Sequence, residues 1–305
     1  MRWFGREKRS LPWRGERDAY RILVSEIMLQ QTRVAVVTNR YKQFLRKFPS
    51  VSRLARANES SVLAAWSGLG YYRRARNLHA AAKHIHSNDR FPTSAAELAQ
   101  LPGIGRYTAA AVASIAFGEP VAVVDGNVKR VIQRLAGKEV SDDTCWKTAQ
   151  ELLELGRPGD FNQAMMELGA TICLPATPVC TRCPVIGFCK SRGTTARAGA
   201  PVVRRKTATL SYLFVRRNGA VLLEQRPKNA SLMPAMWELP LIKGSHKGNN
   251  QPLLKLRHSI TTTDYTILVF SRGKEYGGKW IPQDSVSRLP LTGLARKILC
   301  RLKLL

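Results

Sequence analysis

Acidic residues are scarce in this chain. Its 305 residues include 49 lysines and arginines but only 21 aspartates and glutamates, so the formal net charge is +28 at pH 7. Residues 1–200 carry 30 basic and 16 acidic side chains, and residues 201–305 carry 19 and 5. A positive charge spread over both parts indicates a long polyanion as partner. The alternative is that the charge serves solubility alone.

Long apolar runs are missing as well. No run approaches the roughly 18–20 residues of a membrane-spanning helix, and the N-terminus is polar and basic rather than like a signal peptide. We therefore expect a cytoplasmic protein without a membrane partner. The length predicts two domains.

Four of the six cysteines lie within 17 residues, at Cys173, Cys180, Cys183 and Cys189. In a cytoplasmic chain such a group indicates a metal site before disulfides. A zinc ribbon offers two C-x2-C pairs, and only one exists here. The unequal short spacings favour a [4Fe–4S] cluster held by four thiolates, with zinc as the alternative.

Residues 1–190 show helical periodicity almost throughout, and residues 191–204 have the small, polar composition of a linker. We expect two helices between Tyr20 and Phe48 that break near Gln30, one helix over Ser50–Ala65, and further helices up to Cys173. Residues 205–305 alternate as strands do. Thr207–Arg216 and Ala220–Gln225 are predicted to form a hairpin through Asn218-Gly219.

The stretch 101–130 joins a glycine turn to a carboxylate. Leu101, Gly103 and Gly105 open an alanine-rich helix, where unpaired amides at a helix start suit a phosphate. Asp125 follows an apolar run, and Glu26 lies among apolar neighbours far upstream. A buried carboxyl with a raised pKa and an ionised partner can together cleave a glycosidic bond. Either residue could instead be a helix cap or a salt-bridge partner.

These motifs together resemble the MutY family of adenine DNA glycosylases, in the endonuclease III superfamily. The similarity rests on LPWR at 11–14, SEIMLQQTRV at 25–34, WSGLGYYRRARNLH at 66–79, LPGIGRYTA at 101–109, VDGNVKR at 124–130, NQAMMELGATIC at 162–173, and the cysteine spacing. It is strong over residues 1–190 and weaker over 205–305.

The resemblance implies a multidomain chain. An all-α helix-hairpin-helix glycosylase domain would span residues 1–190, with the hairpin at about 98–118 and the [4Fe–4S] loop at 173–189. The linker 191–204 would lead to a small α/β Nudix-like lesion-recognition domain at 205–305.

The resemblance also implies roles for single residues. By matching position, Glu26 protonates N7 of the flipped adenine and later helps activate water. Asp125 stabilises or captures the oxocarbenium ion. Tyr107 and Asn127 assist near the sugar.

Further matched positions concern recognition of the DNA. The residues that contact the adenine or the opposing 8-oxoguanine would be Arg14, Leu29, Gln30, Gln31, Thr32, Tyr71, Gln163 and Thr261. Leu101, Gly103 and Gly105 would bind phosphates. Arg73, Arg74 and Arg76 also lie where they could meet phosphates, or they could form a solvated helix face.

Tyr107 distinguishes two kinds of chemistry within the superfamily. Glycosylase/lyases similar to this chain have a lysine here, which forms a Schiff base. A phenol cannot do so, and base removal without strand cleavage is expected.

The C-terminal part departs from the family pattern. It lacks the glutamate cluster of a metal-dependent Nudix hydrolase, so we expect no catalysis from it. Where the family has a Phe-Ser-His loop that reads 8-oxoguanine, this chain has Ile260, Thr261 and Thr262.

The sequence predicts a monomeric, monofunctional glycosylase with a [4Fe–4S] cluster, located on the bacterial nucleoid. Its partner would be double-stranded DNA with adenine opposite 8-oxoguanine or guanine. Two alternatives stay open, namely a related enzyme with another opposing-base preference and a DNA-binding module without catalysis.

Overall fold

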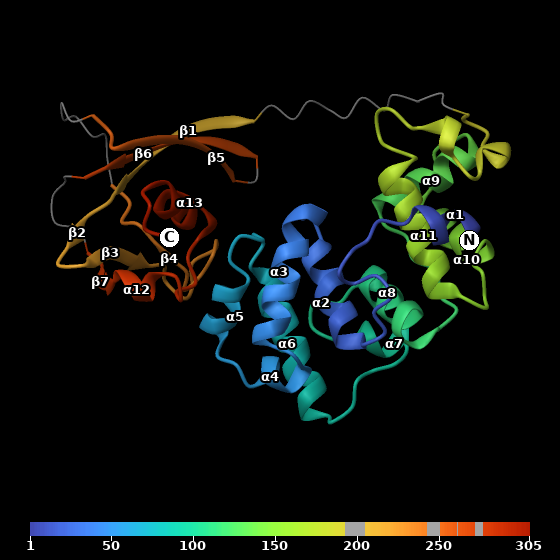
Figure 1. Cartoon of the computed structure of the whole chain (residues 1–305), viewed down its shortest axis with the longest axis horizontal. Helices are drawn as coiled ribbons and strands as arrows, with labels where there is room; N and C mark the ends of the chain where they lie inside the picture. Colours follow the sequence, from blue (N-terminus) through green and yellow to red (C-terminus); the bar gives the residue numbers. More distant parts are fainter. Residues whose placement is uncertain (193–204, 243–250, 261, 272–276) are drawn as a thin grey trace. The chain divides into compact units, whose positions relative to one another are not determined.

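The computed structural model describes residues 1–192, 205–242, 251–260, 262–271 and 277–305. The chain divides into two compact units (Figure 1). One comprises Met1–Arg56 and Arg73–Ala198, and the other comprises Ala57–Tyr72 and Gly199–Leu305. Among the described residues, no helix is long and apolar enough to cross a membrane.

The first unit is helical. Its α-helices are α1 (Arg2–Glu7), α2 (Ala19–Leu29), α3 (Val34–Lys47), α4 (Val51–Ala55), α6 (Arg73–Ser87), α7 (Ala95–Leu98), α8 (Arg106–Phe117), α9 (Gly126–Ala136), α10 (Asp142–Glu151) and α11 (Pro158–Thr171), followed by the short 3₁₀ turns η1 (Cys180–Arg182) and η2 (Ile186–Phe188).

Local signals explain most of these boundaries. Helix α2 begins where the Asp18 side chain accepts a hydrogen bond from the amide of Arg21, and it ends before Gln31, whose φ is 53°. The expected break near Gln30 is confirmed. The single helix expected over Ser50–Ala65 is wrong, because Asn58 caps a new helix by accepting from the amide of Ser61.

Helix α8 lies at the centre of the first unit. Six of its side chains are alanine or serine and most are buried, so neighbouring helices can approach closely. Helix α11 does so at Gly159, where a Cβ atom would lie 2.6 Å from the Ser114 carbonyl oxygen. At Gly169 a Cβ would lie 2.6 Å from the Asn127 Cβ on α9. These two glycines seat α11 against both helices that carry the site.

The second unit is an α/β body. It contains α5 (Glu59–Ala65), the strands β1 (Lys206–Leu213), β2 (Arg216–Arg217), β3 (Ala220–Gln225), β4 (Trp237–Glu238), β5 (Leu254–Ile260), β6 (Thr263–Phe270) and β7 (Lys279–Pro282), and the helices α12 (Gln283–Val286) and α13 (Gly293–Arg301). Strands β1, β6 and β5 form one sheet, with β1 parallel to β6, and β2, β3, β4 and β7 form the other. Helix α13 lies beside the first sheet (Figure 1), and Ile298 and Leu299 share its core with Ile267 and Val269.

The predicted strand Thr207–Arg216 is in fact two strands. The run ends at Leu213 in one sheet and resumes at Arg216 in the other. The expected turn at Asn218-Gly219 is confirmed, because both residues have positive φ, 49° and 72°. It joins β2 to β3 rather than β1 to β3. Strand β5 was not predicted from the sequence.

Candidate active site

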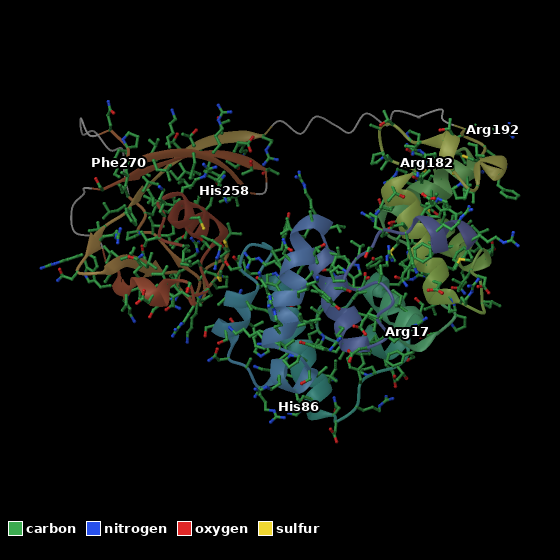
Figure 2. The ribbon with its side chains drawn as sticks, in the orientation of Figure 1. Arg17, His86, Arg182, Arg192, His258 and Phe270 are labelled. Atoms are coloured by element: carbon green, nitrogen blue, oxygen red, sulfur yellow. The ribbon has the colours of Figure 1, made fainter. Side chains whose placement is uncertain are left out.

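A cavity of about 340 Å³ opens between the helices of the first unit. Its walls come from α2, α8, α9, α11 and the turn before α2. They bring together most of the predicted site residues, namely Arg14, Glu26, Leu29, Gln30, Gln31, Thr32, Tyr107, Asp125, Asn127 and Gln163. Arg17, labelled in Figure 2, donates to the Ile115 carbonyl at 3.2 Å and ties this turn to α8.

Glu26 sits on α2 with only 6% of its surface exposed. Its Oε2 accepts a 2.9 Å hydrogen bond from the Tyr107 hydroxyl. Burial raises the pKa of Glu26 to about 7, although the phenol hydrogen bond and the charge of Arg14 both oppose that rise. A carboxyl with this pKa holds its proton on a large fraction of molecules at neutral pH, as a general acid requires.

Asp125 caps helix α9. Its Oδ1 accepts from the amide of Val128 at 2.7 Å, and its Oδ2 accepts from Asn127 Nδ2 at 2.8 Å. The Asn127 oxygen accepts in turn from Arg130 Nη2 at 2.8 Å, and Arg130 Nε donates to the Cys173 carbonyl at 2.8 Å. The Asp125 side chain is therefore held in place at the cavity wall, and Glu26 lines the same cavity.

A buried carboxylate forms the base of the site and was missed by the sequence reasoning. Glu167 on α11 is fully buried and accepts from Arg9 Nε at 2.6 Å, from Arg9 Nη2 at 3.0 Å and from Arg14 Nη2. Arg14 Nη1 donates to Gln163 Oε1 at 2.7 Å, and Gln163 Nε2 donates to the Gly159 carbonyl at 3.3 Å. These hydrogen bonds fix the orientation of the Gln163 side-chain amide toward the cavity. The sequence could have indicated Glu167, because it follows Gln163 by four residues and therefore lies on the same face of the helix.

The segment after α2 is held from the side by Arg74. Its Nη1 donates to the carbonyls of Ile27 and Met28 at 2.9 Å each, and its Nη2 donates to Thr32 Oγ1 at 2.9 Å. Arg74 therefore caps the end of α2, and the expectation that it also meets a phosphate stays a prediction. Gln30 is fixed separately, through a 3.1 Å bond to Thr108 Oγ1.

The glycine turn at the start of α8 has an uncapped helix end. Gly105 is the N-cap and supplies no side chain to the first-turn amides. Gly103 has φ 72°, and a Cβ there would lie 2.1 Å from Asn77 Nδ2. Leu101 is buried beneath the turn. The arrangement leaves amide N–H groups directed outward at a helix N-terminus, where an anion is favoured.

The four clustered cysteines line one small pocket together with Arg134, Ile172 and Ile186. Arg134 Nη1 lies 3.2 Å from Cys173 Sγ, and Cys189 Sγ lies 3.3 Å from the Arg134 carbonyl oxygen. Burial raises the pKa of the Cys183 thiol, and the other three thiols raise it further. No three His, Cys, Asp or Glu side chains in the described residues converge on a single metal ion. Arg182, labelled in Figure 2, joins this loop to α1 through Glu7.

Several predicted residues lie apart from the cavity lining. Tyr71 belongs to the second unit, where it is 58% exposed and has φ 46°. Arg73 is exposed at the start of α6, and Arg76 is partly buried one turn later. Thr261 lies outside the described residues.

Comparison with known proteins gives consistent matches. Residues 24–158 match the HhH-GPD superfamily of base excision DNA repair proteins. The chain is 46% identical over 209 residues to the adenine DNA glycosylase of Homo sapiens, and 38% identical over 291 residues to that of Arabidopsis thaliana. These alignments cover 63% and 79% of this chain. The resemblance expected from the motifs is confirmed.

Solved structures agree with this match. A thermostable thymine-DNA glycosylase is 31% identical with a TM-score of 0.59, over 63% of this chain and 92% of that one. A non-covalent endonuclease III–DNA complex is 25% identical with a TM-score of 0.55, over 63% and 90%. The chain spans only 38% of the human relative and 46% of the plant relative.

Proposed function

The chain belongs to the HhH-GPD superfamily of base excision DNA repair proteins, and we propose that it is a hydrolase that removes adenine mispaired with 8-oxoguanine or guanine in double-stranded DNA. The observation that carries this proposal is the pairing of Glu26, with a pKa of about 7, and the capped Asp125 in one cavity. Its relatives are adenine DNA glycosylases. An enzyme acting on a base must take that base out of the stack into such a pocket.

Glu26 is the proton donor in this reaction. Adenine is a poor leaving group unless one of its ring nitrogens is protonated first. The family resemblance implies that N7 receives this proton. A carboxyl with its pKa near the working pH combines a large protonated fraction with sufficient acidity. After the base departs, the same carboxylate accepts a proton from the attacking water.

Asp125 stabilises the sugar cation. The Val128 amide and the Asn127 side chain hold both of its oxygens, so the carboxylate reaches its position without reorganising during the reaction. Two carboxyl groups with opposite protonation states are what glycosidic cleavage uses. Arg14, Gln163 and Leu29 would hold the base between them.

The proposed reaction ends at base removal. The Tyr107 hydroxyl donates a hydrogen bond to Glu26. A phenol has no amine with which to form a Schiff base at C1′. We expect an intact abasic strand after incubation, and nicking without added alkali would contradict the monofunctional assignment.

The helix-hairpin-helix at about 98–118 would hold the DNA strand. Amides after Gly105 suit a phosphate, and Arg73 and Arg76 would add charge. Gln31 and Tyr71 would fill the space left by the flipped base, since both present a side chain from a left-handed backbone. The roles of Thr32 and Thr261 at the opposing base stay predictions.

The four cysteines fit a [4Fe–4S] cluster. A [4Fe–4S] cubane takes one cysteine thiolate at each of its four irons. The four thiols gather around one pocket, as ligands of a single cluster must, and this supports the assignment. The cluster would hold the 173–189 loop in shape. Iron and acid-labile sulfide near four per chain would support it, and one zinc would contradict it.

The remaining assignments are part of the same proposal. They comprise domain limits at 1–190 and 205–305, a Nudix-like but non-hydrolytic C-terminal domain, a monomer, and a place on the bacterial nucleoid. The α/β character of the second unit supports the Nudix-like assignment.

The deciding experiment is single-turnover release of adenine from duplexes with adenine opposite 8-oxoguanine, guanine or cytosine. We expect release from the first two, at least tenfold faster than from the third, and loss of release with retained DNA binding in Glu26→Gln. Unchanged turnover in that variant would refute the mechanism. Because Ile260 and Thr262 replace the family's aromatic and histidine, a preference for guanine over 8-oxoguanine is the second candidate.

A further inference from the structure

The turn that presents Tyr71 is held under strain. Gly68, Gly70 and Tyr71 have φ values of 96°, 68° and 46°, and the left-handed region is strained for a tyrosine. The Trp66 indole closes the turn by donating to the Gly70 carbonyl at 3.2 Å. Tyr71 itself is 58% exposed between the buried residues Leu69 and Tyr72. Such a conformation persists only where surrounding contacts impose it.

Two of those contacts come from the C-terminal part of the second unit. The Tyr72 hydroxyl donates to the Leu291 carbonyl at 3.0 Å, with both residues buried. Arg296 Nε donates to Ser67 Oγ at 2.6 Å, and Ser67 is fully buried. Leu291 lies two residues before helix α13, and Arg296 is the fourth residue of that helix. The Tyr71 turn is therefore held on both sides by the start of one helix.

The segment before α13 is itself rigidly placed. Trp237 donates its amide to the Pro290 carbonyl at 2.9 Å and accepts from the Thr292 amide at 2.9 Å. The Thr292 side chain then caps α13 by accepting from the Ala295 amide. The Leu291 carbonyl that receives the Tyr72 hydroxyl consequently has little freedom to move.

The same helix also reaches the strand that leads to the opposing-base segment. Lys297, next to Arg296, donates to the Arg257 carbonyl at 2.8 Å. Arg257 lies on β5 beside His258, which Figure 2 labels, and three residues before Ile260. Strand β5 pairs with β6 up to Ile260 opposite Thr263. Helix α13 thus contacts both the turn that carries Tyr71 and the strand that leads to Ile260.

We propose that α13 positions the Tyr71 turn, so that the turn and the end of strand β5 form one recognition body for the opposing base. Tyr72 and Ser67 are its positioning residues. This inference rests on the proposed function for its consequence, because Tyr71 matters only if a base is read beside it. The physical claim, that the turn is held through α13, stands on the contacts alone.

The variants Tyr72→Phe and Ser67→Ala test the proposal without changing charge. Each removes one hydroxyl. The matched control is Ser60→Ala on α5, whose exposed hydroxyl donates to Asn58 Oδ1 at 3.1 Å. A net hydrogen bond of this kind corresponds to about fivefold in a local opening equilibrium. Hydrogen exchange of the amides 68–72 should therefore accelerate about fivefold in both variants and not in the control.

A double-mutant cycle tests the functional consequence. We expect Tyr72→Phe to slow single-turnover adenine release opposite 8-oxoguanine about fivefold, and to have less than a twofold effect when Tyr71→Ala is already present. An equal effect in both backgrounds would overturn the claim that Tyr72 acts through Tyr71. Unchanged exchange in both hydroxyl variants would overturn the positioning itself, whether or not the protein releases adenine. A wild-type protein that releases no adenine, with accelerated exchange in the variants, would instead count against the proposed function alone.

Discussion

Burial raises the pKa of Glu26, and the hydrogen bond from the Tyr107 hydroxyl limits that rise. The effect of removing this hydroxyl on the pKa can be calculated. In Tyr107→Phe the carboxylate of Glu26 loses its 2.9 Å donor, while burial, which raises its pKa, stays. A hydrogen bond to a charged group is worth about 1.5–3 kcal/mol, or roughly one to two pKa units. Starting from about 7, the pKa of Glu26 should therefore rise by at least one unit.

The sign of the pH effect follows from the role of the group. In the proposed reaction Glu26 is the general acid and works while protonated, so release of adenine should fall as the pH rises above the pKa of Glu26. A higher pKa moves this descending limb to higher pH. Single-turnover rates between pH 5 and 9 should show a limb near pH 7 in the wild type and near pH 8 or above in Tyr107→Phe, whatever happens to the plateau rate.

The control is a buried tyrosine elsewhere in the same unit. The Tyr41 hydroxyl has no hydrogen-bond partner among the described residues, so Tyr41→Phe should leave the limb in place. A limb in Tyr107→Phe that stays at the wild-type position, or moves to lower pH, would refute the idea that this hydroxyl stabilises the ionised form of Glu26.

Three further perturbations follow from the geometry. Because burial penalises its charged form, Glu26→Gln should raise the free energy of unfolding by about 3 kcal/mol at pH 8 and by little at pH 5, measured by urea titration at both. Glu167→Gln should lower the free energy of unfolding by about 2 kcal/mol, which is less than for a fully buried ion pair because Arg9 is 39% exposed. The hydrogen bonds from Arg9 hold the pKa of Glu167 below its usual value, so this loss of stability should shrink at acid pH. In the glycine turn, Gly103→Ala should lower the free energy of unfolding by more than about 1 kcal/mol, because of the positive φ and the contact with Asn77. Gly105→Ala has open space around its Cβ and should lower it less, as measured by thermal melts. Equal losses of stability would contradict this account of the turn.

The sequence was most informative where the signal is local. Asp125 had two possible roles in the sequence, a helix cap or a catalytic carboxylate. The structure shows the cap, and the catalytic role is part of the proposal. A cap positions a carboxylate at a helix start, and this helix start borders the cavity. The alternatives were therefore never exclusive, and spacing alone could not reveal that.

The strands were less predictable because pairing is non-local. Thr207–Arg216 reads as one apolar, β-branched run, yet its end at Leu213 is set by β6, which lies more than fifty residues away. Strand β5 carries Lys255 and Arg257 on one face, and such a half-exposed strand has a weak apolar signal. This segment forms a strand because it pairs with β6, and that pairing cannot be seen in the local sequence.

Two buried glutamates in one cavity show what only the fold decides. Glu26 and Glu167 both lie on helices among apolar neighbours, and burial alone would raise the pKa of each. Hydrogen bonds from Arg9 and the charge of Arg14 bring Glu167 below its usual pKa, whereas Glu26 receives a neutral phenol. The proposed acid is therefore the carboxyl without an arginine hydrogen bond. The charge of Arg14 lowers the pKa of both carboxyls, but burial still holds the pKa of Glu26 at about 7. Exchanging Arg14 for methionine should consequently raise the pKa of both carboxyls, and a pH profile in which the limb stayed at the wild-type position would contradict this division of labour.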